Sequence, residues 1–185
     1  MKKTIENIIV LYDTHNQGKT STLRALIKEL VGSLPNDNGD IRVVIPNYRV
    51  KSQRKRFNIF VTTCGDNPFV IDDNIRFFNG KMPDSQSVPA FIFNNGSWKA
   101  IESQDEFADH AANICISACR TDGAGVDELQ CFTHTHLSYT FVSMWIRLKH
   151  LRNKLNMPRT KKEPDWGLLA QELKNLVDKI IITVR

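Results

Sequence analysis

A short apolar run, a Gly-Lys-Thr turn and a helix-forming segment follow one another near the start of the chain, and they constrain its fold most. Residues 8–12 (IIVLY) have the length and composition of a buried strand, and residues 23–30 (LRALIKEL) favour a helix. Between them the chain reads DTHNQGKTST over residues 13–22. A strand, a turn and a helix in direct succession are typical of the first unit of an α/β sheet. We therefore expect this turn at the carboxyl end of the first strand.

The turn ends in the residues that a phosphate-binding loop requires. In such a loop the backbone N–H groups and the N-terminus of the following helix face the phosphates of a nucleotide. Lys19 would extend to the phosphoryl oxygens, and the Thr20 hydroxyl would bind Mg²⁺. A Gly-Lys-Thr that merely begins a helix is the alternative interpretation. The predicted nucleotide-binding residues are Asp13, Thr14, His15, Asn16, Gln17, Gly18, Lys19, Thr20 and Ser21.

Asp13 departs from the pattern G-x-x-x-x-G-K-[ST], whose first glycine falls five positions before Gly18. Aspartate tolerates unusual backbone angles better than most residues, but it adds a negative charge close to the phosphates. We therefore expect Asp13→Gly to bind a triphosphate at least as well as the native chain. A large loss of affinity would instead mean that Asp13 holds the loop by hydrogen bonds.

In addition to Lys19, two candidate catalytic residues follow further predicted strands. Residues 57–64 (FNIFVTTC) are β-rich and lead to Asp66, which would bind the metal, position the attacking water, or cap the next helix. Residues 113–118 (NICISA) read as a buried strand, after which Arg120 would stabilise phosphoryl charge in the transition state. The alternative for Arg120 is an ordinary strand-to-helix turn. The predicted catalytic residues are thus Lys19, Asp66 and Arg120, and the predicted metal ligands are Thr20 and Asp66.

These motifs resemble the P-loop NTPase superfamily, with a Walker A motif at residues 13–20 and a Walker B end at Asp66. Gly18, Lys19 and Thr20 match the family's phosphate and Mg²⁺ positions. The resemblance implies Mg²⁺ and ATP, or GTP, as cofactors. For a small GTPase, residues 62–65 stand in the place of D-x-x-G and residues 119–122 in the place of N-K-x-D, and only the final residue of each matches.

Apolar runs alternate with helical segments along almost the whole chain, which is typical of a three-layer α/β fold with a mainly parallel central sheet flanked by helices. We expect a single domain over residues 1–185. Strands are predicted at 8–12, 41–48, 57–64, 91–93, 98–100 and 113–118, and helices at 19–31, 66–78, 104–112, 126–134 and from Asp165 onward.

A hairpin is predicted in the first half of the chain, and one later segment leaves a choice between strand and helix. Residues 41–48 and 57–64 predict a hairpin, and Pro46 indicates that the first of its strands lies at a sheet edge. Residues 139–155 fit a strand by their β-branched and aromatic content, and they fit a helix by their apolar spacing.

Lysine and arginine are concentrated in two runs of the chain, which has a net charge of +5. Residues 49–56 contain five of them and residues 147–162 contain seven, with no acid in either run. Such runs bind nucleotides, nucleic acids or other phosphate-rich partners in a salt-sensitive way. A solvated hairpin tip and a solvated helix face are the alternative interpretation.

The cysteines and the short apolar runs point to the cytoplasm and away from membranes. Four cysteines occur without a C-x-x-C pair, which favours reduced thiols over a disulfide framework or a zinc site. No apolar run has the length of a signal peptide core or a membrane span.

The sequence therefore predicts a nucleoside-triphosphate-binding protein, specifically a Mg²⁺-dependent ATPase rather than a GTPase, acting as a switch or as part of a complex. Three alternatives stay open. The first is a small nucleotide kinase, or phosphotransferase, with residues 147–162 as its lid. The second is a GTP-binding switch. The third is a non-catalytic nucleic-acid-binding module with a degenerate loop.

Overall fold

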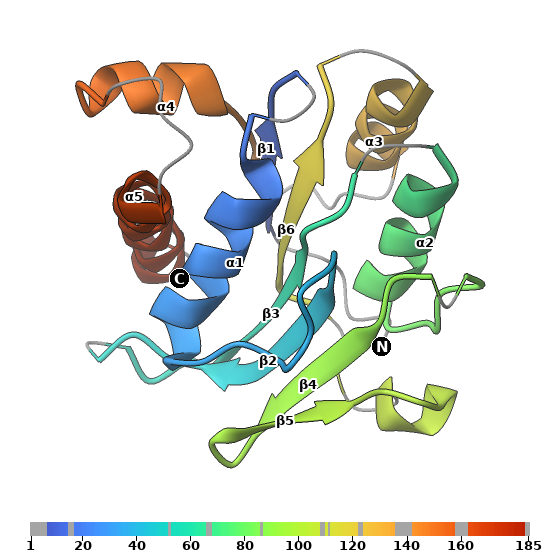
Figure 1. The fold of residues 1–185 in the computed structure, drawn as a ribbon. Helices are drawn as coiled ribbons and strands as arrows, with labels where there is room; N and C mark the ends of the chain where they lie inside the picture. The colour runs from blue at the N-terminus through green and yellow to red at the C-terminus, as the bar shows by residue number, and fades with distance from the viewer. Residues whose placement is uncertain are drawn as a thin grey trace.

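Seven strands form one mixed sheet in the computed structural model, in the order β5-β4-β2-β3-β6-β1-β7 (Figure 1). The structure describes residues 7–14, 17–51, 53–65, 68–85, 87–107, 110, 112–121, 124–135, 142–157 and 163–183. The strands are β1 (Asn7–Tyr12), β2 (Arg42–Tyr48), β3 (Phe57–Thr62), β4 (Ala90–Asn94), β5 (Ser97–Ala100), β6 (Ile114–Cys119) and β7 (Val142–Arg147).

Parallel pairing dominates the half of the sheet that contains β1. This strand pairs in parallel with β6 and with β7, and β6 pairs in parallel with β3. The β2–β4 pair is also parallel, whereas β2–β3 and β4–β5 are antiparallel hairpins. The carboxyl ends of β3, β6, β1 and β7 therefore lie along one edge of the sheet, which we call the carboxyl edge.

Helices cover both faces of the sheet (Figure 1). Helices α1 (Lys19–Val31) and α5 (Glu163–Thr183) pack on the face that receives Ile9 and Leu11 of β1. Helices α2 (Pro68–Phe78) and α3 (Ala124–Thr135) pack on the opposite face, which receives Ile8 and Val10. Because successive side chains of a strand point to opposite faces, the apolar run of β1 supplies both cores. The short helix α4 (Leu148–Lys154) directly follows β7.

The predicted α/β class, the hairpin of residues 41–48 and 57–64 and the helices on both faces are confirmed. The sheet is mostly parallel but contains antiparallel pairs, and the NTPase-type arrangement stays a prediction. Residues 139–155 supply both predicted alternatives, since β7 ends at Arg147 and α4 begins at Leu148.

Three details of the prediction are wrong. The strand that contains Pro46 lies inside the sheet, between β3 and β4. Its proline is tolerated because β4 pairs only with Arg42–Val44 and the β2–β3 register is irregular after Ile45. Where a helix is expected at 104–112, the described residues form a 3₁₀ turn at Gln104–Phe107, and residues 108, 109 and 111 lie outside the description. The last helix begins at Glu163, two residues before the expected cap.

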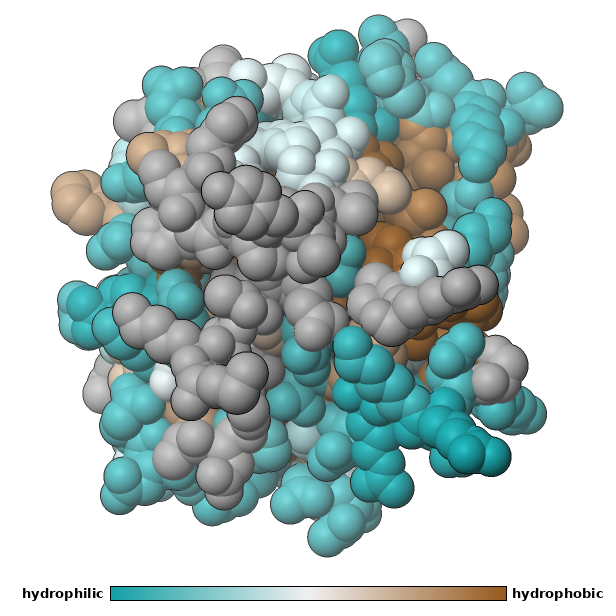
Figure 2. All heavy atoms as spheres, turned by 180° about the vertical axis from the view of Figure 1, so that it is seen from behind, coloured by the Kyte–Doolittle hydropathy of each residue, from teal (hydrophilic) through white to brown (hydrophobic). Residues whose placement is uncertain are grey.

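The molecular surface carries mostly hydrophilic residues on the face seen from behind, with hydrophobic residues gathered to the right of the middle (Figure 2). The large apolar side chains most exposed in the described part of the chain are Phe69, Leu168 and Ile182. None of the helices described is long and apolar enough to cross a membrane.

Candidate functional site

The predicted loop joins β1 to α1 at the carboxyl edge. Gly18 caps the N-terminus of α1 with a φ of 86°, and its carbonyl accepts hydrogen bonds from the Thr22 N–H (2.9 Å) and hydroxyl (2.8 Å). A Cβ atom at Gly18 would lie 2.0 Å from the Trp166 ring of α5. Glycine is therefore required there by both the backbone angle and the ring packed on it.

Lys19 is the first residue of α1, and its side chain folds back over the loop. Its Nζ donates to the backbone carbonyls of Asp13 (3.0 Å) and Thr14 (2.8 Å), and the residue is only 6% exposed. These bonds hold the ammonium group against the loop at the head of the helix. The lysine charge is thus close to the place where phosphates would lie, and it also ties the loop together.

Asp13 has a bonding role that the motif did not predict. Its carboxylate accepts hydrogen bonds from the backbone N–H groups of Thr14 (2.9 Å) and Lys149 (2.8 Å), and the residue is 4% exposed. The Arg147 Nε lies 3.8 Å from the same carboxylate. The carboxylate therefore accepts hydrogen bonds from the loop and from the start of α4, and Asp13 links the two segments.

A cavity of about 180 Å³ opens between the loop and α4. Its charged lining consists of three cationic side chains, Arg147, Lys149 and Arg152, and the acidic Asp13. Arg152 also donates to the Gln17 carbonyl (3.2 Å) and stacks on Trp166, with 4.9 Å between the guanidinium carbon and the ring centroid. The structure thus places the first part of the predicted basic run 147–162 beside the loop, where it could neutralise anionic groups.

Three oxygen-bearing groups meet beside the loop, on the side of β2 and β3. The Thr20 hydroxyl lies 3.1 Å from Asp40 Oδ1 and 3.1 Å from the Thr63 carbonyl. The Thr63 hydroxyl lies 3.1 Å from the same Asp40 oxygen. We call Thr20, Asp40 and Thr63 the oxygen cluster. Its donor set of hydroxyl, carboxylate and carbonyl oxygens is the kind that Mg²⁺ prefers.

Of the other predicted site residues, the structure describes Arg120 and Ser21. Arg120 follows β6 at the carboxyl edge, next to the loop, because the Asp13 N–H donates to the Cys119 carbonyl (3.4 Å). Ser21 is the third residue of α1. His15, Asn16 and Asp66 lie outside the described residues.

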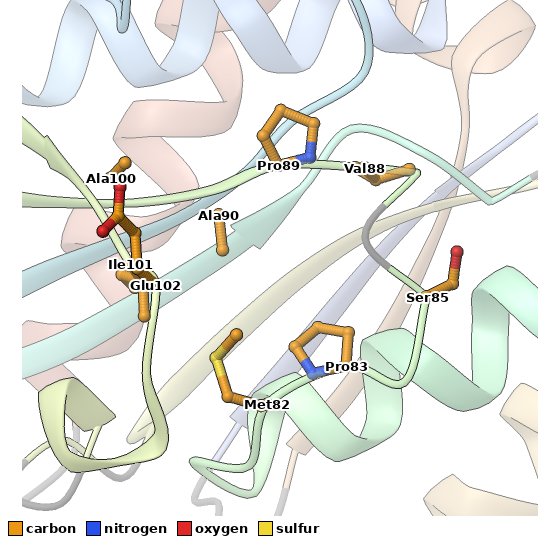
Figure 3. Close-up of a pocket in the computed structure, with 9 residues that line it drawn as sticks. All are labelled: Met82, Pro83, Ser85, Val88, Pro89, Ala90, Ala100, Ile101 and Glu102. Carbon is orange, nitrogen blue, oxygen red and sulfur yellow. The ribbon is translucent and has the colours of Figure 1, made fainter.

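A second cavity, of about 380 Å³, lies between β4, β5 and the segment before β4 (Figure 3). Its lining is mainly apolar and includes Met82, Pro89 and Ile101, with Glu102 as the charged residue. The buried Arg42 does not line it but braces its wall, donating to the Val88 carbonyl (2.8 Å) and to Asn74 (2.9 Å). This cavity is larger than the one at the loop, but its lining lacks the cations that a polyphosphate needs.

Sequence reasoning missed Asp40 and Trp166. Asp40 directly precedes a β-rich run, which places it at a strand end, but nothing local shows that it reaches Thr20. Trp166 is separated from Gly18 by almost the whole chain, so only the packing of α5 on α1 reveals their contact.

Comparison with known proteins gives no match to this chain among protein-family models, curated proteins or solved structures. The chemistry of the site therefore rests on its own groups. It combines cations beside a helix N-terminus with oxygen ligands suited to a divalent cation.

Proposed function

We propose that this chain binds a nucleoside triphosphate together with Mg²⁺ and hydrolyses it, with ATP as the expected nucleotide and GTP as the alternative. One observation carries the proposal: Lys19 is held at the head of α1, directly after β1, beside a cavity lined by three cations. A helix N-terminus with a lysine and further cations attracts phosphate groups. In this role the protein would act as a switch or as part of a complex in the cytoplasm.

The size and charge of the cavity indicate which part of a nucleotide it would hold. A volume of about 180 Å³ is smaller than typical small-molecule sites. It suits phosphate groups, and the nucleoside would extend outside it. Arg147 and Lys149 would contact phosphate oxygens across the cavity from the loop residues Thr14 and Gln17.

Each group near the loop would have its own part in hydrolysis. Lys19 would neutralise charge on the transferred phosphoryl group, and Arg120 would add a second cation from β6. When bound, Mg²⁺ would supply positive charge that neutralises the charge developing on the phosphates. Thr20 supplies an oxygen ligand suited to it, and Asp66 keeps the role of positioning the attacking water that its place in the sequence predicts.

Isothermal titration calorimetry with Mg-ATP and Mg-GTP tests the proposal. We expect Lys19→Ala to weaken the affinity by roughly a hundredfold, because it removes charge-assisted bonds to phosphate. Lys28→Ala is the matched control, since it removes the same charge from an exposed position at the other end of α1. Urea unfolding of both variants separates a loss of binding from a loss of loop structure.

Equal affinities for the native protein and Lys19→Ala would refute the assignment of the loop. Adding nucleoside monophosphates and analysing the products distinguishes hydrolysis from the alternative, phosphoryl transfer by a nucleotide kinase.

A second candidate function is favoured by the turn between β2 and β3. Its five basic residues are all exposed, and we call them the basic turn: Arg49, Lys51, Arg54, Lys55 and Arg56. Because this turn precedes β3, it lies at the sheet edge opposite the phosphate loop. We infer that the basic turn binds the phosphate backbone of a nucleic acid independently of any nucleotide.

Fluorescence anisotropy with a labelled DNA duplex over a series of salt concentrations tests the second function. Replacing Arg54, Lys55 and Arg56 by glutamine should weaken binding and reduce the salt slope by about 0.9 per lost phosphate contact. Neutralising the exposed Lys28, Lys81 and Lys179 is a control with the same net charge. Equal losses in both triple variants would show nonspecific attraction and contradict a site at the turn.

A further inference from the structure

No acidic residue stands in β3 or in residues 63–65 that follow it, and Asp66 lies outside the described residues. After its last buried residue the chain continues Thr63-Cys64-Gly65. Cys64 is buried and hydrogen-bonded to Asn74, so it faces away from an open site. A Cβ atom at Gly65 would lie 1.9 Å from the Ala118 carbonyl, so this segment is pressed against β6. Among the described residues, the carboxylate that accepts a hydrogen bond from Thr20 is that of Asp40, two residues before β2.

The spacing of the oxygen cluster matches the geometry of Mg²⁺. Adjacent ligands of an octahedral Mg²⁺, with bonds of about 2.1 Å, lie about 3.0 Å apart. The Thr20 hydroxyl and the Asp40 carboxylate are separated by 3.1 Å, and the Thr63 carbonyl is 3.1 Å from the same hydroxyl. The Thr20 hydroxyl could therefore occupy the corner of an octahedron next to either of the other two groups with little movement.

The charge and position of Asp40 also suit a cation. Asp40 is half-buried, and in the described part of the chain no lysine or arginine forms an ion pair with it. The segment before it is fixed to α1, because Arg24 donates to the carbonyls of Asp37 and Gly39. Its charge acts on the buried Arg42, but a carboxylate that is held in place and forms no ion pair in the described part of the chain is ready to accept a metal ion.

We propose that Asp40 is the acidic anchor of Mg²⁺ in this protein, with the Thr20 hydroxyl as its neighbouring ligand. The inference rests on the proposed nucleotide-binding function, and it moves metal binding from Asp66, as the sequence predicted, to Asp40. Asp66 retains the positioning of water. The metal would then lie between α1 and the start of β2, and the phosphates would complete its coordination.

The test compares ATP affinity with Mg²⁺ and with EDTA in the native protein and in three variants, by calorimetry. In Asp40→Asn the amide oxygen still accepts the Thr20 hydroxyl bond, but the charge is lost. We expect the affinity gained from Mg²⁺ to fall at least tenfold, while the affinity without metal stays equal or rises, because a negative charge near the phosphates is removed. Thr20→Val should also lose the ATP affinity gained from Mg²⁺. Glu29→Gln, on the exposed side of α1, removes a carboxylate outside the cluster and should keep it.

Electron paramagnetic resonance of Mn²⁺ with ADP gives a second readout that does not depend on hydrolysis. The native complex should immobilise Mn²⁺, and Asp40→Asn should release it. If Asp40→Asn keeps the full gain from Mg²⁺, or if Asp66→Asn alone removes it, the assignment to Asp40 is overturned. If the native protein binds no ATP with or without metal, the proposed function fails first and this inference fails with it.

Discussion

Replacing Asp13 by glycine would restore the residue of the phosphate-loop pattern, yet the structure predicts a less stable protein. The Asp13 carboxylate is buried and accepts hydrogen bonds from two backbone N–H groups, those of Thr14 and Lys149. Glycine removes both acceptors and leaves two donors that only water can satisfy. It also removes a bond between the loop and α4, to which Lys149 belongs, and leaves the bond from Arg152 to the Gln17 carbonyl.

The expected size of the effect follows from these bonds. A hydrogen bond to a charged group contributes about 1.5–3 kcal/mol. Two such bonds, reduced by water that enters the adjacent cavity, give a loss of about 3 kcal/mol in the free energy of unfolding. Asp13 does not have a positive φ, so glycine relieves no backbone strain there and its extra freedom adds about 0.5–1 kcal/mol to the loss.

Urea unfolding monitored by circular dichroism measures this loss directly. Asp13→Asn is the matched variant, because its amide oxygen keeps one acceptor, and we expect about half of the loss. An unfolding free energy of Asp13→Gly equal to or above that of the native protein would refute the role assigned to the carboxylate. The triphosphate affinity of Asp13→Gly, predicted from the sequence to be undiminished, is then measured under conditions where the variant is folded.

The remaining predictions concern glycine and cysteine. Gly18→Ala should lower the unfolding free energy by about 2–4 kcal/mol and shift the tryptophan fluorescence, because of its positive φ and the Trp166 ring; unchanged fluorescence and stability would contradict that packing. Burial raises the pKa of the Cys64 thiol from 9.0 to about 11. The protonated thiol therefore makes its full contribution to the unfolding free energy below pH 9. We expect about 2 kcal/mol of the unfolding free energy to be lost as the pH rises to 11, and urea unfolding of Cys64→Ala should show a shallower decline; an identical decline would exclude Cys64 as a source. Of the four thiols, only Cys131 is exposed, so Ellman's reagent should titrate one fast thiol in the native state, and four fast thiols would indicate an open fold.

The sequence predicted those parts of the fold that depend on local patterns. The apolar run of β1, the turn ending in Gly18 and the amphipathic helix α5 each carry their own signal, so their type could be read directly. Pro46 led to a wrong prediction of an edge strand. A proline destabilises an inner strand only where the neighbouring strand pairs with it, and the pairing of β4 ends before Pro46. That pairing is a long-range property of the chain.

The site, too, could be predicted only where it depends on residues that are close together in the sequence. Gly18 and Lys19 are recognisable because the loop and its helix are continuous in sequence. The bonds from Asp13 to Lys149 and from Thr20 to Asp40 join residues that are distant along the chain. They arise only when β7 pairs with β1 and β2 with β3, which places α4 and the start of β2 beside the loop.

The central claim is that the loop at the head of α1 recognises phosphate. Calorimetric titration of the native protein with ATP, ADP, AMP and adenosine in the presence of Mg²⁺ tests it most directly. If Lys19 and the cations of α4 bind the phosphates, the affinity should rise with each added phosphate, and ATP should bind at least a hundredfold more tightly than adenosine. Equal affinities along the series, or no binding of ATP at all, would contradict the claim.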